Sequence, residues 1–150
     1  MRKLAFALLV LPLLIGCAST SKAPVEKSEE AKRFEKHPDK AVVYLYRTGR
    51  MVGAAGQIQV KINGIEAGGT GPGTFFRWEL NPGTYSFMSS TAESSRVVEL
   101  EVKAGEHYFL RQDARVGVNA GRVTLVEKDE KTGMKEIDGC KLIVSAYKQE

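Results

Sequence analysis

The stretch QIQVKING, residues 57–64, decides the fold class. Every second residue over 58–62 is an isoleucine or a valine, so an extended strand here has one apolar face and one polar face. Asn63 and Gly64 follow, and they favour a type I′ turn because both can adopt the positive φ that this turn requires. The stretch therefore predicts a β-hairpin that returns through residues 65–68.

Similar short runs rich in β-branched and aromatic residues continue on both sides of this hairpin. The run 42–46 is apolar at every position, which is typical of a central strand covered on both faces. A charged stretch over 128–138 is expected to form a loop or a short helix. Further strands are predicted at 76–80, 84–89, 96–102, 107–112, 122–127 and 142–147, with a second hairpin joining 76–80 to 84–89 and a third joining 96–102 to 107–112.

Most of these strands have one aligned apolar face, and a single flat sheet would leave those faces in water. Two sheets must pack face to face, or one sheet must curl closed, to bury them, and we favour the first arrangement. The sequence therefore predicts an all-β domain over residues 41–150, an antiparallel β-sandwich of about 7–8 strands.

Residues 1–16 have the layout of a secretory signal peptide. Arg2 and Lys3 are cationic, and the run 4–15 is apolar apart from Pro12. As a helix of about 12 residues the run would reach about 18 Å, short of the roughly 30 Å of hydrocarbon in a bilayer. We expect a cleaved export signal rather than a membrane-spanning helix.

The signal ends in Leu14-Ile15-Gly16-Cys17, which resembles the lipobox of bacterial lipoproteins. The resemblance implies that signal peptidase recognises Leu14, Ile15 and Gly16, cuts before Cys17, and leaves fatty acids on that cysteine. Two or three acyl chains make such an anchor effectively permanent. Residue 18 is alanine, whereas an aspartate there favours the inner membrane in Gram-negative lipoproteins, so the resemblance implies the outer membrane, facing the periplasm.

Residues 17–40 are predicted to be a lipidated tether, because Ser, Lys and Glu dominate and large apolar residues are few. A helix over 26–36 is compatible with the sequence but is marginal alone in water. A flexible tether of this length would hold the domain roughly 25 Å from the lipid and allow about 75 Å at full extension.

The charge balance argues against a nucleic-acid partner. The chain has 22 Lys and Arg against 18 Asp and Glu, and Arg2 and Lys3 leave with the signal peptide. The mature chain is then nearly neutral and has no block of like charges that would bind a phosphate backbone.

Cys140 has no disulfide partner within the mature chain, because Cys17 is committed to lipid. Two interpretations stay open for it: a small buried hydrophobic residue, or a thiol that forms an intermolecular disulfide. The histidines of the mature chain, His37 and His107, are too few for a zinc site, and no nucleophile elbow is present. We therefore expect no metal, no cofactor and no catalysis.

The glycine-rich segment 49–73 contains Gly68-Gly69-Thr70-Gly71-Pro72-Gly73, which lacks the Lys-Ser/Thr ending of a phosphate cradle. The run 68–73 is predicted to be a mobile connection between strands and the first place to look for an interface. The candidate binding surface consists of residues in or beside the glycine-rich segment, Arg50, Phe75, Arg77 and Trp78. Trp78 is either an exposed anchor or, because it aligns with other apolar residues, part of the core.

Three stretches give residues 31–147 a family resemblance: 40–47 (KAVVYLYR), 73–78 (GTFFRW) and 105–112 (GEHYFLRQ). Through them the chain resembles small bacterial lipoproteins with a domain of unknown function numbered 2846. A looser likeness, to PEGA-type β-domains of envelope proteins, depends on residues 60–64, 69–70 and 80–85. Both resemblances imply a prealbumin-like or related β-sandwich, and neither family is named for an activity.

Three functional hypotheses follow. The first is a membrane-anchored, non-enzymatic binding or adaptor domain that contacts another envelope protein. The second is a module that binds a glycan such as peptidoglycan or lipopolysaccharide, for which Trp78 and the tyrosines would supply stacking surfaces. The third is an enzyme, which would need Asp, Glu, His107 or Cys140 to converge in one pocket.

Overall fold

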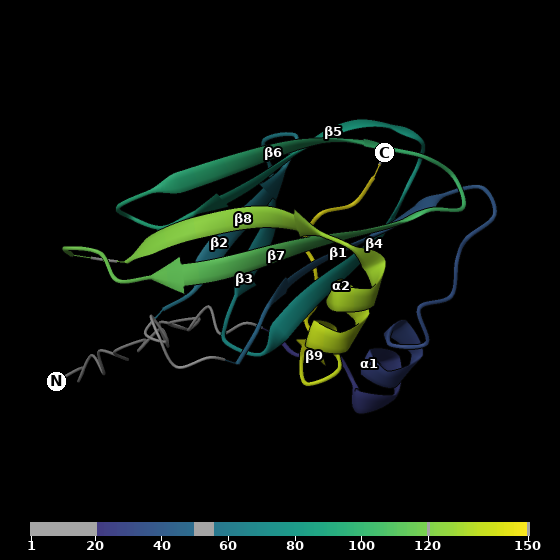
Figure 1. Ribbon diagram of the computed structural model, residues 1–150, viewed down its shortest axis with the longest axis horizontal. Helices are drawn as coiled ribbons and strands as arrows, with labels where there is room; N and C mark the ends of the chain where they lie inside the picture. The colour runs from purple at the N-terminus through teal and green to yellow at the C-terminus, as the bar shows by residue number, and fades with distance from the viewer. Residues whose placement is uncertain (1–20, 50–55, 120, 150) are drawn as a thin grey trace, which may run out of the picture.

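The computed structural model describes residues 21–49, 56–119 and 121–149 and shows a β-sandwich with two short helices (Figure 1). The predicted signal peptide, Cys17 and Arg50 lie outside the described residues. In chain order the elements are α1 (Val25–Ala31), β1 (Ala41–Arg47), β2 (Ile58–Ile62), β3 (Ile65–Thr70), β4 (Thr74–Leu80), β5 (Gly83–Ser90), β6 (Ser95–Val102), β7 (His107–Arg115), β8 (Arg122–Lys128), α2 (Glu130–Ile137) and β9 (Lys141–Leu142).

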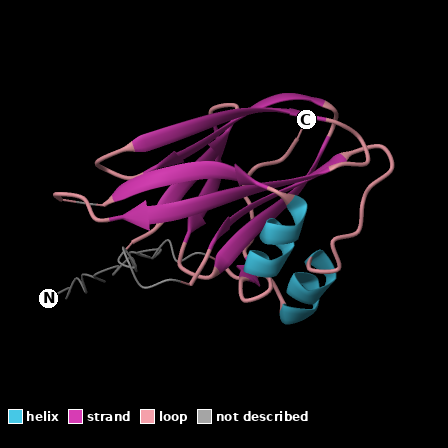
Figure 2. Ribbon diagram, viewed as in Figure 1, coloured by secondary structure: helices cyan, strands magenta, loops and turns pink. Residues whose placement is uncertain are grey.

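The first sheet has five strands in the order β8-β7-β1-β4-β9, with β1 at its centre. β1 pairs with β4 antiparallel and with β7 parallel. All seven residues of β1 are buried, because the second sheet covers one of its faces and the helices cover the other. Figure 2 shows both helices on the same side of this sheet. The prediction of a central strand at 42–46 is confirmed.

The second sheet has four strands in the order β3-β2-β5-β6. In β2, Ile58, Val60 and Ile62 are buried and the residues between them are half-buried, as the alternation predicts. The β2–β3 hairpin turns at Asn63 and Gly64, whose φ angles are 49° and 79°. The Asn63 side chain also accepts a hydrogen bond of 2.8 Å from the Ser86 amide of β5, which ties the turn to the sheet.

Two apolar clusters stabilise the fold, one on each face of the five-stranded sheet. The larger lies between the two sheets and includes Trp78, which is 6% exposed. The smaller lies between the five-stranded sheet and the helices, and it consists of Ala31, Val42, Tyr44, Tyr46, Phe75, Phe109, Ile137 and Cys140.

A polar cluster also lies between the two sheets. Thr70 of β3, Ser89 of β5 and Gln112 of β7 are each 0% exposed. The Gln112 amide nitrogen donates to the Ser89 hydroxyl at 2.8 Å, and the Thr70 hydroxyl donates to the Gln112 carbonyl oxygen. The cluster therefore joins the two sheets through one glutamine.

The second and third predicted hairpins are wrong. β4 belongs to the five-stranded sheet and β5 to the other, so the Asn81-Pro82-Gly83 turn carries the chain across the sandwich. β6 and β7 are likewise in different sheets, while β5 pairs with β6 and β7 with β8. A turn sequence reports a change of direction but not the rotation of the next strand, which decides whether two strands pair or face each other.

The structure differs from the expected flexible tether over residues 21–40. α1 packs on the sheet through Ser28 and Ala31, and the chain before it pairs with residues 142–144. Phe34 follows the helix with φ of 52°, a strained conformation for a large residue, and its ring packs on Tyr44 and Phe109. Residues 21–40, which were predicted to be a tether from their composition, thus cover part of the outer apolar face of β1.

The glycine-rich segment and the C-terminal region also differ in part from expectation. Gly68, Gly69 and Thr70 belong to β3 rather than to a mobile connection. The predicted last strand at 142–147 is reduced to β9 and a bridge at Ile143, because residues 144–147 turn toward β3, where the Ala146 amide donates to the Ala67 carbonyl. The charged stretch over 128–138 forms α2, one of its two expected forms. In the described residues no helix is both long and apolar enough to cross a bilayer.

Candidate functional site

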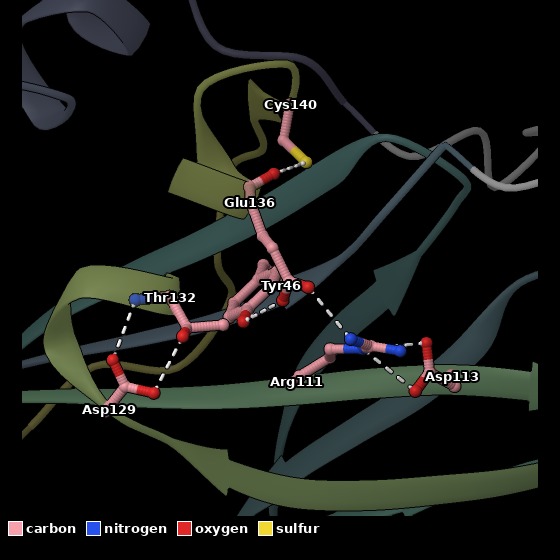
Figure 3. Close-up of polar contacts among 7 residues, drawn as sticks. All are labelled: Tyr46, Arg111, Asp113, Asp129, Thr132, Glu136 and Cys140. Atoms are coloured by element: carbon pink, nitrogen blue, oxygen red, sulfur yellow. Dashed lines mark hydrogen bonds and ion pairs between the residues drawn. The ribbon is translucent and has the colours of Figure 1, made fainter. Parts of the chain in front are cut away.

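The polar groups beneath α2 form a network on the outer face of the five-stranded sheet (Figure 3). Tyr46 of β1 donates its phenol proton to Glu136 of α2 at 2.6 Å. Arg111 of β7 donates to the second oxygen of the Glu136 carboxylate at 2.8 Å and to Asp113 at 3.0 and 3.1 Å. One carboxylate of α2 is therefore held by two neighbouring strands.

The sequence around α2 explains how Glu136 reaches this position. Asp129 caps the helix, accepting from the Thr132 amide at 2.9 Å and from the Thr132 hydroxyl at 2.7 Å. These bonds hold the pKa of Asp129 below its ordinary value. Gly133 then packs against the Phe109 ring without a side chain between them, so that the helix lies close enough for Glu136 to meet Arg111.

The contacts within this network also set the protonation states of Tyr46 and Arg111. Burial, and then the Glu136 carboxylate, raise the pKa of Tyr46, so the phenol stays a neutral donor at physiological pH. The hydrogen bond that Arg111 donates to the Asp113 carboxylate raises the pKa of Arg111, which stays charged. Each charged group is compensated by another, and the arrangement fixes α2 to the sheet.

Cys140 lies beside this network at the end of α2. It is 2% exposed, and its thiol donates to the Glu136 carbonyl at 3.5 Å and the Arg47 carbonyl at 3.6 Å. Burial raises its pKa to about 11. The interpretation as a small buried residue is confirmed, whereas an intermolecular disulfide would require the cysteine to leave the apolar cluster.

A second feature is a cleft of about 330 Å³ between α1, the segment after it and β4. Arg77 of β4 borders it, donating to the Glu79 carboxylate at 2.9 Å and to the Tyr44 hydroxyl at 3.4 Å. The partners raise the pKa of Arg77, although burial acts against them as the largest single influence. The remaining lining residues include side chains of both charge signs and a few apolar ones; they are Lys27, Glu30, Ala31, Glu35, Lys36, His37, Pro38, Glu79 and Leu142.

This cleft is suited to binding a polar surface. Its charges are mixed in sign, and one side of it is a helix that also packs on the core. Lys27 is paired with Glu30 at 2.8 Å, yet both side chains are more than half exposed. Such an exposed ion pair contributes little stability, so either side chain can pair with a charged group of a binding partner instead. Arg77 offers a guanidinium positioned by a tyrosine and a glutamate, which matches a carboxylate or phosphate group.

His107 has a structural position that the sequence did not predict. Its side chain is 1% exposed. One ring nitrogen lies 3.2 Å from a Glu130 oxygen of α2, and the other lies 3.4 Å from the Glu35 carbonyl after α1. The imidazole therefore connects the two helical segments.

The predicted binding surface is only partly assembled. Phe75 is fully buried in the smaller cluster, and Trp78 faces the opposite side of β4, where its indole nitrogen donates to the Ser145 hydroxyl at 2.8 Å. Arg77, by contrast, borders the cleft between α1 and β4. The burial of Trp78 removes one of the aromatic surfaces that the glycan hypothesis names, whereas Tyr108 and Tyr147 are only partly buried.

The network beneath α2 was missed by sequence reasoning, although one signal points to it. β1 is apolar on both faces, so its outer face needs a cover, and a capped helix follows β8 with a carboxylate on its inner side. Within the described residues no group of three or more His, Cys, Asp or Glu side chains is arranged to hold a metal ion.

Comparison with known proteins matches this sequence to one family. A family model described as "Protein of unknown function (DUF2846)" matches residues 37–127. A protein of Haemophilus influenzae, described as uncharacterized, is 30% identical over 135 residues, which cover 89% of this chain and 79% of the relative. The family match contains β1 to β7 and most of β8, hence Tyr46, Arg77 and Arg111, but ends before α2.

Proposed function

The chain belongs to the DUF2846 family of proteins of unknown function, and on that premise we propose that it is a lipid-anchored protein of the bacterial cell envelope whose β-sandwich is a binding or adaptor domain. The anchor is the acylated Cys17, the leaflet is that of the outer membrane facing the periplasm, and the partner is another envelope protein. The observation that carries the anchor is the sequence Leu14-Ile15-Gly16-Cys17, placed directly after an apolar run.

The binding role is supported by the cleft between α1 and β4. Arg77 is held at its border by Tyr44 and Glu79, and exposed charges of both signs surround it. Such a surface fits a protein segment with its own mixed charges better than a long polyanion. By contrast, the ionised groups beneath α2 are compensated internally, and the Cys140 thiol is buried with a raised pKa.

The anchor is tested in the native host with Cys17→Ala and the unchanged chain. We expect the unchanged protein to sediment with outer membranes and to have the mass of a chain beginning at an acylated Cys17. The variant should lose the acyl mass and appear in the soluble fraction. An unchanged chain that keeps its leader, or has an unmodified thiol at residue 17, would refute the anchor.

The binding role is tested by photo-crosslinking in intact cells from a probe placed at Lys36, in the cleft. The matched control has the same probe at Arg96, an exposed cation on β6 of the other sheet. We expect one protein to crosslink from residue 36, not from residue 96, and to be lost when Arg77→Ala is added. Crosslinks that are identical from both positions would contradict the assignment of the cleft.

A further inference from the structure

We propose that the edge of the sandwich formed by β3, β9 and residues 143–146 rests against the phospholipid surface. The three linking residues 18–20, here called the leash, hold it there. This inference rests on the proposed function, because it requires fatty acids on Cys17. It replaces the picture of a domain that moves freely on a long tether with one of fixed orientation.

The length of the leash follows from where the packed chain begins. The Ser21 carbonyl accepts a hydrogen bond of 2.9 Å from the Val144 amide, and the Ala23 amide donates to the Leu142 carbonyl at 2.9 Å. Lys22 pairs with Ile143 in an isolated β-bridge between these bonds. The chain is therefore part of the fold from Ser21 onward, and four Cα steps from Cys17 to Ser21 span at most about 14 Å.

This reach excludes the opposite edge from the bilayer. The five-stranded sheet has the order β8-β7-β1-β4-β9, so β8 is four strand spacings from β9, about 19 Å. If the β8 edge lay on the membrane, Ser21 would stand farther from the lipid than the leash can reach. Of the two edges of this sheet, the one that carries Ser21 is therefore the nearer to the lipid.

The chemistry beside Ser21 suits phospholipid headgroups. A groove of about 390 Å³ runs between β3 and residues 144–146, and Glu66 is the one charged side chain among its lining residues in the described chain. Val144 is 59% exposed, and Lys22 and Lys141 are exposed beside it. Small neutral groups permit close approach to the interface, while the lysines are attracted to anionic lipid.

The test uses the acylated protein, purified from a host that lipidates it and reconstituted into vesicles of phosphatidylethanolamine and phosphatidylglycerol. Single cysteines are placed by Val144→Cys, at the near edge, and by the matched Val126→Cys on β8, both in a Cys140→Ala background. Val126 is also an exposed valine, at 47%. Each cysteine carries the same fluorophore, and a spin label on the lipid headgroups quenches it.

We expect strong quenching at residue 144 and little at residue 126. A Gly/Ser insert of about twelve residues between Thr20 and Ser21, with an r.m.s. length of about 20 Å, should reduce the difference. Equal quenching at both positions in the protein without the insert, or a difference that the insert does not change, would overturn the inference. Protein without acyl mass that fails to float with the vesicles would instead refute the proposed anchor, and the inference with it.

Discussion

Gly133 shows how one residue without a side chain sets the distance between a helix and a sheet. A Cβ atom at this position would lie 2.3 Å from the Phe109 ring, whose edge is part of the smaller apolar cluster. Alanine is ordinarily the better helix former by about 1 kcal/mol, so intrinsic propensity and packing oppose each other here. Packing decides, because the ring is enclosed by Tyr44 and Phe34 and cannot move away freely.

Gly133→Ala should therefore destabilise the domain by about 1–3 kcal/mol, the range of an overpacked core. The measurement is the free energy of unfolding in urea. Gly139→Ala is the matched control, since a Cβ atom there meets nothing within 4 Å, and it should change stability by no more than about 0.5 kcal/mol. Equal effects at the two glycines would contradict the contact.

The Cys140 thiol predicts a pH dependence of stability. Its pKa is about 11 in the fold against an ordinary 9.0, so between these values the unfolded chain loses a proton that the folded chain keeps. Stability should be unaffected below about pH 9 and should fall by up to about 1.4 kcal/mol per pH unit above it, relative to Cys140→Ala. The readout is the difference between the two proteins' unfolding free energies from pH 7 to 11. A constant difference would show that the thiol titrates normally.

At the scale of elements, α1 has the composition of an unstructured segment and yet belongs to the fold. With seven residues it is too short to persist alone, so its stability comes from contacts with β1 and β9. The Tyr44 hydroxyl donates to the Ala31 carbonyl at 3.1 Å, and the Ser28 hydroxyl accepts from the Leu142 amide at 3.0 Å. Beyond the C-terminal end of α1, the Phe34 ring packs on Tyr44 and Phe109.

Phe34→Ala should release α1 while the sandwich stays folded. We expect trypsin to cut the variant after Lys27, Lys32 and Arg33 about tenfold faster than the unchanged protein, because local opening becomes more frequent when apolar contacts are removed. Mass spectrometry of timed digests gives the rates. Val25→Ala, at a residue of the same helix that is 72% exposed, serves as the control and should leave the rates unchanged. Rapid cleavage of the unchanged protein would restore the tether interpretation.

At the scale of the whole molecule, Gln112 joins the two sheets through Thr70 and Ser89 within an otherwise apolar interior. An unpaired buried polar group costs about 1–3 kcal/mol, whereas replacing all partners by apolar residues of similar shape can be nearly neutral. The cluster is therefore expected to respond very differently to single and to combined substitution.

Gln112→Ala should lower the unfolding free energy by about 2–4 kcal/mol, since it leaves two buried hydroxyl groups without this partner. Adding Thr70→Val and Ser89→Ala to Gln112→Leu should recover most of the loss, as measured in the same urea titration. Gln59→Ala, on the outer face of β2, is the control and should change little. A combined variant less stable than Gln112→Ala would show that the cluster contributes net stability.

Local sequence patterns were sufficient for the β class, for the strands at the centre and in the first hairpin, and for the position of a loop or short helix over residues 128–138. These features depend on local physics: the two-residue period of a strand, the positive φ of Asn63 and Gly64, and the hydrogen bonds of Asp129. The Leu14-Ile15-Gly16-Cys17 pattern, on which the proposed anchor depends, is likewise a linear motif that can be recognised without the fold.

Which strands pair and which residues meet depends on the complete fold. The turn at Asn81 joins two different sheets because the apolar faces of β4 and β5 are buried on opposite sides of the core between the sheets. Residues 21–40 pack on the domain because they cover the outer apolar face of β1. The Tyr46–Glu136 pair spans ninety residues of chain. No local pattern encodes such a contact, because its stability arises from burial shared by segments that only the complete fold brings together.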